Sequence, residues 1–169
     1  MTRPNPISEI VRLNEIGTGL ARRIEPDGEA RMRVARALDL ASLDAFVAEM
    51  RVEPNRAGWH LSGRVLAEAV QTCGITLEPL PVSIDERFGI DLVEEAEAEP
   101  DEEVEISLDD DAPDVVEDAK IDLGQYAFEQ LALHLDPFPR KPGAVFVQPE
   151  EPAEISPFAV LKARPSDQD

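Results

Sequence analysis

The amino-acid sequence predicts an α+β fold: an antiparallel β-sheet centred on a long hairpin, with three packed α-helices and an acidic, partly disordered loop. Three observations underlie this prediction. Residues 59–77 alternate between apolar and polar side chains, a second alternating run spans residues 82–92, and apolar residues recur at helical spacing elsewhere. Because alternation with a period of two places successive side chains on opposite faces of a sheet, both runs predict half-buried strands.

The run at 59–77 is the strand around which we expect the other elements to be arranged. Its length exceeds the roughly 3–10 residues of an ordinary strand, so we expect a bend or bulge at Gly63 or Gly74. The short, proline-rich connection 78–81 leads into the second run at 82–92. Two alternating runs joined in this way predict an antiparallel hairpin.

The residues before this hairpin predict two short strands and two helices. The strands are expected at 8–13 and 20–24, on either side of a glycine-containing turn. Asp27 is suited to cap a helix at 28–38, because its carboxylate can accept hydrogen bonds from free backbone N–H groups. A further helix is predicted at 43–50. Its apolar residues lie at helical spacing: Leu43, Phe46, Val47 and Met50.

A third helix is predicted at residues 123–135. Asp122 and Gln125, three residues apart, resemble a capping box at its start. Pro137 ends it, because proline lacks the backbone N–H that a helix requires. Its apolar stripe is formed by Leu123, Ala127, Leu131 and Leu135.

Charge is distributed unevenly along the chain and bears on its domain organisation. Residues 1–64 carry a net charge of +1, whereas residues 65–169 carry −21. Residues 94–118 contain fourteen carboxylates and no lysine or arginine, a composition that favours a solvated, mobile segment. We therefore expect one α+β domain at 1–149 with a mobile acidic insertion at 94–118, followed by a linker and C-terminal tail at 150–169.

Several functional classes receive no support from the sequence. No apolar run approaches the roughly 20 residues of a membrane span, and a single cysteine agrees with a reducing compartment, so we expect a cytoplasmic protein without a membrane partner. Metalloprotease, serine-hydrolase and phosphate-loop motifs are absent. The run Asp109, Asp110 and Asp111 fails the calcium-loop template, which has glycine at its sixth position where this chain has Asp114. We expect no enzyme activity, cofactor, metal or small-molecule substrate.

Two kinds of macromolecular partner are compatible with the charge pattern. The acidic C-terminal part should repel nucleic acid and attract a basic protein. The alternative is direct RNA binding by a patch of basic residues near the N-terminus, although such residues more often form a solvated face or pair with carboxylates. The arginines concerned are Arg22, Arg23, Arg31, Arg33 and Arg36.

Three stretches in succession resemble the YceD family of large ribosomal RNA subunit accumulation proteins. They are residues 71–79 after the long strand, residues 121–139 through the predicted helix to a Pro-Phe-Pro segment, and the closing residues 156–162. Many family members have Cys-x-x-Cys in the first stretch. Here Cys73 is followed by Thr76 in the second position, which removes the metal ligand pair. Ser156 replaces the asparagine of the closing motif, and both residues are good helix caps.

The resemblance implies a non-catalytic role in the accumulation or maturation of 23S ribosomal RNA. With the charge pattern, it suggests binding of a basic ribosomal protein or assembly factor, with RNA affected indirectly. The residues expected to bind the partner lie in three places: the acidic run Asp109, Asp110 and Asp111, the basic pair Arg140 and Lys141, and the tail residues Pro157, Phe158 and Leu161. The tail can dock in a groove of a partner or pack on its own domain, and the sequence leaves both open.

Overall fold

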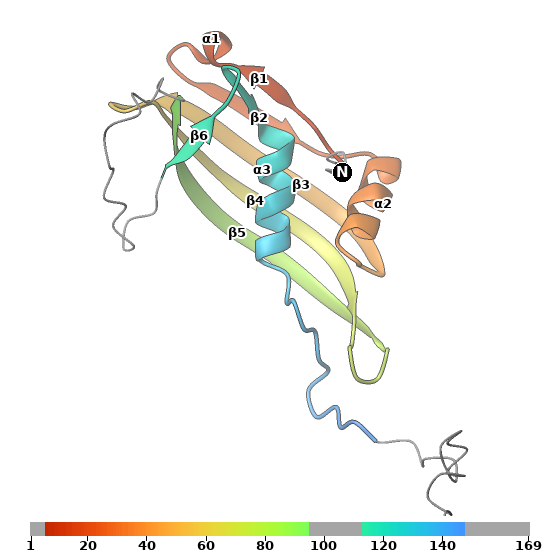
Figure 1. Cartoon of the computed structure of the whole chain (residues 1–169). Helices are drawn as coiled ribbons and strands as arrows, with labels where there is room; N and C mark the ends of the chain where they lie inside the picture. Colours follow the sequence, from red (N-terminus) through yellow and green to blue (C-terminus); the bar gives the residue numbers. More distant parts are fainter. Residues whose placement is uncertain (1–5, 95–112, 148–169) are drawn as a thin grey trace, which may run out of the picture.

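A twisted β-sheet with helix α3 across one face dominates the computed structural model, which describes residues 6–94 and 113–147 (Figure 1). The elements in chain order are β1 (Ile10–Arg12), α1 (Leu13–Ile16), β2 (Leu20–Ile24), α2 (Gly28–Ala37), β3 (Ser42–Pro54), β4 (Trp59–Thr72), β5 (Pro79–Glu94), β6 (Asp114–Val116), β7 (Lys120–Asp122) and α3 (Leu123–Leu133).

The main sheet has five strands in the order β2-β3-β4-β5-β6. The first four are antiparallel neighbours, whereas β6 runs parallel to the end of β5. Strands β1 and β7 form a separate two-stranded antiparallel sheet. The mixed α+β content predicted from the sequence is therefore observed, with one parallel pair that was not predicted.

Strand β4 lies at the centre of the main sheet and has one buried face. Its residues Leu61, Val65, Ala67, Ala69 and Gln71 are buried, and they alternate with more exposed residues. This one-sided burial is what the alternating apolar pattern of the sequence predicts. Gly63 interrupts the row, and a Cβ at that position would lie 2.6 Å from the ring of Phe88 on β5. The Phe88 ring thus fills the space that a side chain would otherwise take.

The helix predicted at residues 43–50 is wrong, because this stretch belongs to strand β3. Beyond a register shift between Leu43 and Ala45, every second residue is buried. The spacing that suggested a helix also fits a strand once that shift is included, and pairing with both β2 and β4 favours the strand. The buried residues are Phe46, Ala48, Met50 and Val52.

The bend expected in the long strand lies elsewhere. Strands β4 and β5 keep an unbroken register from Trp59–Leu92 to Thr72–Pro79, so Gly63 carries no bulge. Gly74 lies in the turn after β4, which ends at Thr72 rather than at residue 77. The irregularity is instead in β3.

The N-caps predicted at Asp27 and Asp122 are confirmed, while the side-chain amide of Gln125 donates to the Glu129 carboxylate at 2.6 Å. The carboxylate of Asp27 accepts a hydrogen bond from the Ala30 backbone N–H at 2.7 Å, and that of Asp122 accepts from Gly124 and Gln125 at 2.9 and 3.2 Å. The two helices that follow correspond to those predicted at 28–38 and 123–135. No helix in the described ranges is long and apolar enough to cross a membrane.

Asp122 also joins the N-terminal segment to the start of α3 by hydrogen bonds. It accepts a hydrogen bond from the Ser8 hydroxyl and one from the Glu9 backbone N–H, each at 2.8 Å. The Leu123 N–H donates in return to the Glu9 carbonyl at 2.9 Å. A Cβ at Gly124 would lie 2.7 Å from the Ser8 Cα, so this close approach requires glycine.

We predict that Gly124→Ala destabilises the fold, although alanine is the better helix former by about 1 kcal/mol. The added methyl group would contact backbone atoms of residues 7–9 at 2.7 to 2.9 Å, and overpacking of this kind costs about 1–3 kcal/mol. Urea unfolding followed by circular dichroism measures the difference.

Gly28→Ala is the matched control, because a Cβ there would meet only the end of the Arg31 side chain at 3.9 Å. It should leave the free energy of unfolding unchanged or slightly increased. Equal stability of the two variants would show that residues 7–9 do not pack on α3 as described.

Candidate functional site

The turn between β4 and β5, residues 73–78, folds closely around Cys73. The Cys73 N–H donates to the Glu78 carbonyl and the Leu77 N–H to the Cys73 carbonyl, each at 2.9 Å. The thiol itself is fully buried. It accepts hydrogen bonds from the backbone N–H groups of Lys141 at 3.3 Å and Thr76 at 3.4 Å.

These donors make the Cys73 thiol unusually acidic. The hydrogen bond from the Lys141 backbone, followed by those from Thr76, lowers the pKa of Cys73 from 9.0 to about 6, whereas burial opposes this shift. The backbone N–H dipoles therefore favour the thiolate form of this side chain. Neither around Cys73 nor elsewhere in the described ranges do three or more histidine, cysteine or acidic side chains form a group suited to a metal ion.

Further hydrogen bonds and an ion pair join the segment after α3 to this turn. The Lys141 ammonium lies 3.0 Å from both carboxylate oxygens of Glu78 and lowers the pKa of that carboxyl group. The Gly74 N–H donates to the Pro139 carbonyl at 2.9 Å, and the buried Gln71 amide donates to the Asp136 carbonyl at 2.8 Å. Lys141 thus has a structural partner within its own chain.

Arg140, the neighbour of Lys141, lines a cavity of about 510 Å³. This cavity lies between the end of α2, the end of β4, the end of α3 and the segment that follows α3. Its wall is partly apolar, with Leu38, Leu135 and Phe138, and it includes the carboxylate-bearing Asp39. The structure therefore separates the roles of the two predicted basic residues, since only Arg140 faces this space.

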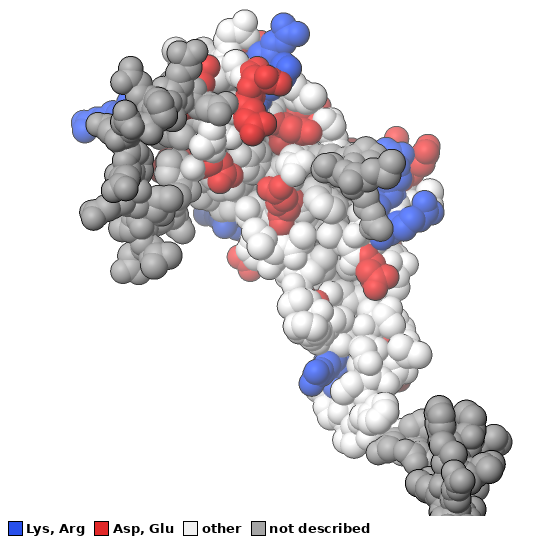
Figure 2. All heavy atoms as spheres, in the orientation of Figure 1, with Lys and Arg blue, Asp and Glu red and all other residues white. Residues whose placement is uncertain are grey.

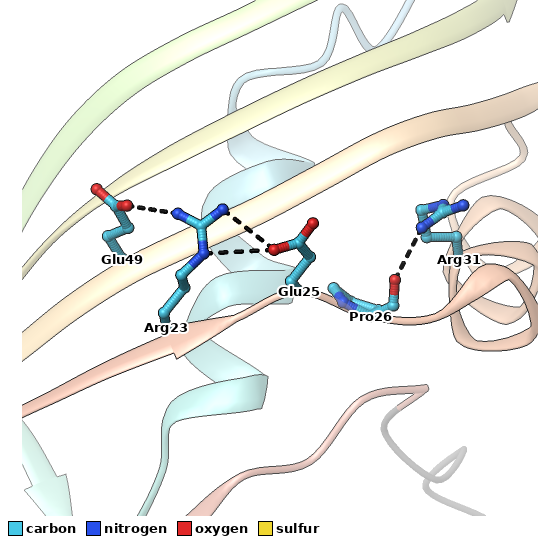
Figure 3. Close-up of polar contacts among 5 residues, drawn as sticks. All are labelled: Arg23, Glu25, Pro26, Arg31 and Glu49. Carbon is cyan, nitrogen blue, oxygen red and sulfur yellow. Dashed lines mark hydrogen bonds and ion pairs between the residues drawn. The ribbon is translucent and has the colours of Figure 1, made fainter.

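The five N-terminal arginines do not converge on one surface. Arg22 and Arg23 are successive residues of β2 and point to opposite faces of the sheet. Figure 3 shows Arg23 between Glu25 and Glu49, with its shortest contacts at 3.1 and 2.6 Å, while Arg31 donates to the Pro26 carbonyl at 2.9 Å.

The remaining three arginines have separate surroundings. Arg22 lies 3.7 Å from Glu9, and Arg33 pairs with Glu29 one helical turn away at 3.3 Å. Arg36 lines a cavity beside α2 and the start of β3, together with Arg31. Three of the five arginines, Arg22, Arg23 and Arg33, contact a carboxylate, which offsets part of the positive charge available to an RNA phosphate.

A second arginine cluster, which sequence reasoning missed, lies across the sheet face opposite α3. The strand register brings Arg23, Glu49, Arg64 and Arg87 into one row, with Arg51 beside it, around a shallow depression of about 750 Å³. Carboxylates balance its charge, since Arg64 contacts Asp85 and Arg51 contacts Glu53. This cluster depends on the register of β3 with its neighbours. That register could not be predicted, because residues 43–50 were predicted to form a helix.

Residues 61–163, more than half of the chain, match the family model described as Large ribosomal RNA subunit accumulation protein YceD. The chain belongs to the YceD family. The match begins within β4 and includes Cys73, Lys141 and α3, whereas the five N-terminal arginines lie outside it. No curated protein and no solved structure matches the chain.

Six of the predicted partner-binding residues lie outside the described ranges. They are the acidic run Asp109, Asp110 and Asp111 and the tail residues Pro157, Phe158 and Leu161. The tail residues and the acidic run both fall within the part of the chain that matches the YceD family. Their predicted roles therefore remain predictions.

We predict that the Cys73 thiolate makes the stability of this YceD-family protein depend on pH. Because the folded-state pKa is lowered to about 6 from 9.0, the stabilisation is fully present above about pH 9 and is lost as the pH falls through about 6. The difference in melting temperature between the wild type and Cys73→Ala should therefore increase from about pH 6 to about pH 9.

Lys141→Ala provides the control, because it removes the ion pair with Glu78 but keeps the backbone N–H that faces Cys73. The pH trend should persist in this variant, with only the small overall loss of stability that is typical of exposed ion pairs. A difference between wild type and Cys73→Ala that does not vary with pH would contradict the prediction.

Proposed function

We propose that this chain is a non-catalytic factor that supports the accumulation or maturation of large-subunit ribosomal RNA by binding a basic ribosomal protein or assembly factor. Membership of the YceD family supports the link to this RNA. The net charge of −20 supports a basic protein as the direct partner, because the negative field attracts cations and repels phosphate.

The observation that most strongly favours this partner is where the acidic insertion is attached. Its two ends meet at one edge of the sheet, because Leu92 of β5 pairs with Asp114 of β6 and Glu94 pairs with Val116. Ten carboxylates lie between residues 95 and 112 of the sequence, between two segments that pair side by side. Charges of one sign concentrated in this way are a suitable target for a basic protein.

The described surface near this attachment point is acidic as well. Figure 2 shows carboxylates gathered over the end of the molecule that carries β6, β7 and the start of α3, while the segment after α3 is largely uncharged. Asp114, Glu117, Asp118 and Glu129 are exposed or half-buried in this region. Burial and the nearby Asp114 raise the pKa of Tyr126, whose hydroxyl contacts that carboxylate at 3.1 Å.

We predict that neutralising the ten carboxylates of residues 95–112, by Asp→Asn and Glu→Gln substitution, abolishes recovery of the partner from lysate at low salt. Glu94 and Asp114 are retained so that the pairing of β5 with β6 is undisturbed. Tagged protein, affinity capture and mass spectrometry at low and moderate salt make the measurement. Binding by the wild type should weaken with salt, because exposed charges are screened beyond about 10 Å at 0.1 M.

A variant with the five N-terminal arginines replaced by glutamine is the control, and it should recover the same partners as the wild type. Equal recovery by the wild type and the neutralised insertion would eliminate the acidic segment as the interaction surface. The direct RNA-binding alternative instead predicts a salt-sensitive gel shift with ribosomal RNA fragments that is lost in the arginine variant.

A further inference from the structure

Strand β5 has an open edge along most of its length. It pairs with β4 from Pro79 to Glu94, but on its other side β6 pairs with it only at residues 92–94. Figure 1 shows β5 at the border of the main sheet. Within the described ranges no strand pairs with this border at residues 79–91. Such an edge presents backbone N–H and C=O groups with which another extended chain can form hydrogen bonds.

The usable part of this edge is residues 82–91. Pro79 and Pro81 lack a backbone N–H and limit strand pairing at one end. At the other end, β6 already occupies the edge from Leu92 onward. About ten residues remain, which is longer than a typical strand of about 5–6 residues.

The side chains along this edge form a symmetric pattern on the face that α3 covers. Ile84 is buried, and Phe88 is half-buried and packs against the core. Between them lies Glu86, which is exposed and pairs in register with the buried Val65 of β4. Val82 and Ile90 continue the apolar row on either side. A single carboxylate thus lies in the middle of an otherwise apolar row.

We propose that the open edge of β5 binds an extended segment of the basic protein partner by strand addition, and that this segment has the pattern apolar–x–basic–x–apolar. The inference builds on the proposed function and specifies the partner's chemistry. The apolar residues of the segment lie opposite Ile84 and Phe88, and its lysine or arginine lies opposite Glu86. Because the pattern is symmetric about its centre, it fits in either strand direction.

Charge complementarity favours a basic segment at this edge. Residues 79–94 carry four carboxylates, Asp85, Glu86, Asp91 and Glu94, against Arg87 as the only basic residue. Asp85 is bound by Arg64 and Asp91 contacts His60 at 2.8 Å, both on the opposite face of the sheet. Glu86 is therefore the carboxylate that a residue of an added strand would meet on the apolar face, where opposite charges across two strands contribute about 0.2–1 kcal/mol.

A second copy of the chain fits the edge less well. Antiparallel pairing of two β5 strands would match Ile84 with Phe88 and Asp85 with Arg87 only in the register that places Glu86 directly opposite Glu86. Like charges in that position are destabilising. Inward-pointing charges on edge strands are also a known means by which sheets avoid pairing with themselves. Glu86 therefore disfavours pairing with a second copy of the chain and favours a basic partner.

The experiment uses two labelled nine-residue peptides, Val-Thr-Val-Thr-Lys-Thr-Val-Thr-Val and the same peptide with glutamate at its centre. Fluorescence anisotropy measures their binding to the full-length protein. The wild type should prefer the lysine peptide by about 2- to 10-fold, and Glu86→Lys should reverse the preference. Amide hydrogen exchange at residues 82–91 should slow when the lysine peptide binds.

Glu68→Lys is the matched control, because it makes the same change of charge on β4, on the opposite face, where Glu68 accepts a hydrogen bond from Ser83. It should keep the preference for the lysine peptide. Equal affinity of the wild type for both peptides, or the same reversal in Glu68→Lys, would overturn the inference. These outcomes do not depend on the lysate experiment. The proposal for the β5 edge can therefore be wrong even if the acidic insertion is found to capture a partner.

Sedimentation velocity completes the test. The wild type should remain monomeric, whereas Glu86→Val should form a concentration-dependent dimer because the opposed carboxylates are gone. Dimerisation of the wild type that is lost when the β5 edge is altered would show that a second copy occupies the edge, and this would overturn the proposal.

Discussion

One carboxylate, that of Asp122, joins parts of the chain more than a hundred positions apart. It caps α3 through Gly124 and Gln125, and it accepts hydrogen bonds from Ser8 and Glu9 near the N-terminus. A helix cap alone contributes about 0.5–2 kcal/mol. Here the cap also fixes where α3 begins, and α3 supplies the fully buried Leu123 and Leu131 to the core. The burial of the apolar face of β4 therefore depends on this junction.

Local patterns in the sequence were sufficient for some elements and not for others. The two helix caps and the half-buried strand β4 follow from residues close together in the chain, so they could be predicted. Strand β3 could not, because its apolar residues also fit helical spacing when the shift between Leu43 and Ala45 is unknown. Strand β6 was missed because Asp114–Val116 lies in a strongly acidic run, and its pairing with β5 is a tertiary contact.

The same distinction applies to the candidate site. Cys73 and Thr76 could be placed at the end of the long strand from the sequence. The contact of the Lys141 N–H with the Cys73 thiol joins residues 68 positions apart, and it is the main cause of the lowered pKa of Cys73. The ion pair between Lys141 and Glu78 likewise turns an apparently free basic residue into a structural one. Sequence could identify these groups but not their partners.

Strand β5 connects the two surfaces that we propose for partner binding. Its C-terminal end leads into the acidic insertion, and its open edge lies immediately before that end. In the proposed function the two surfaces act at different stages of one encounter. Long-range attraction by clustered carboxylates mainly raises the rate of association, whereas backbone hydrogen bonds and apolar contacts mainly lower the rate of dissociation. Under this proposal, an acidic segment attached beside an open strand edge would bring a basic chain to the place where its backbone can pair.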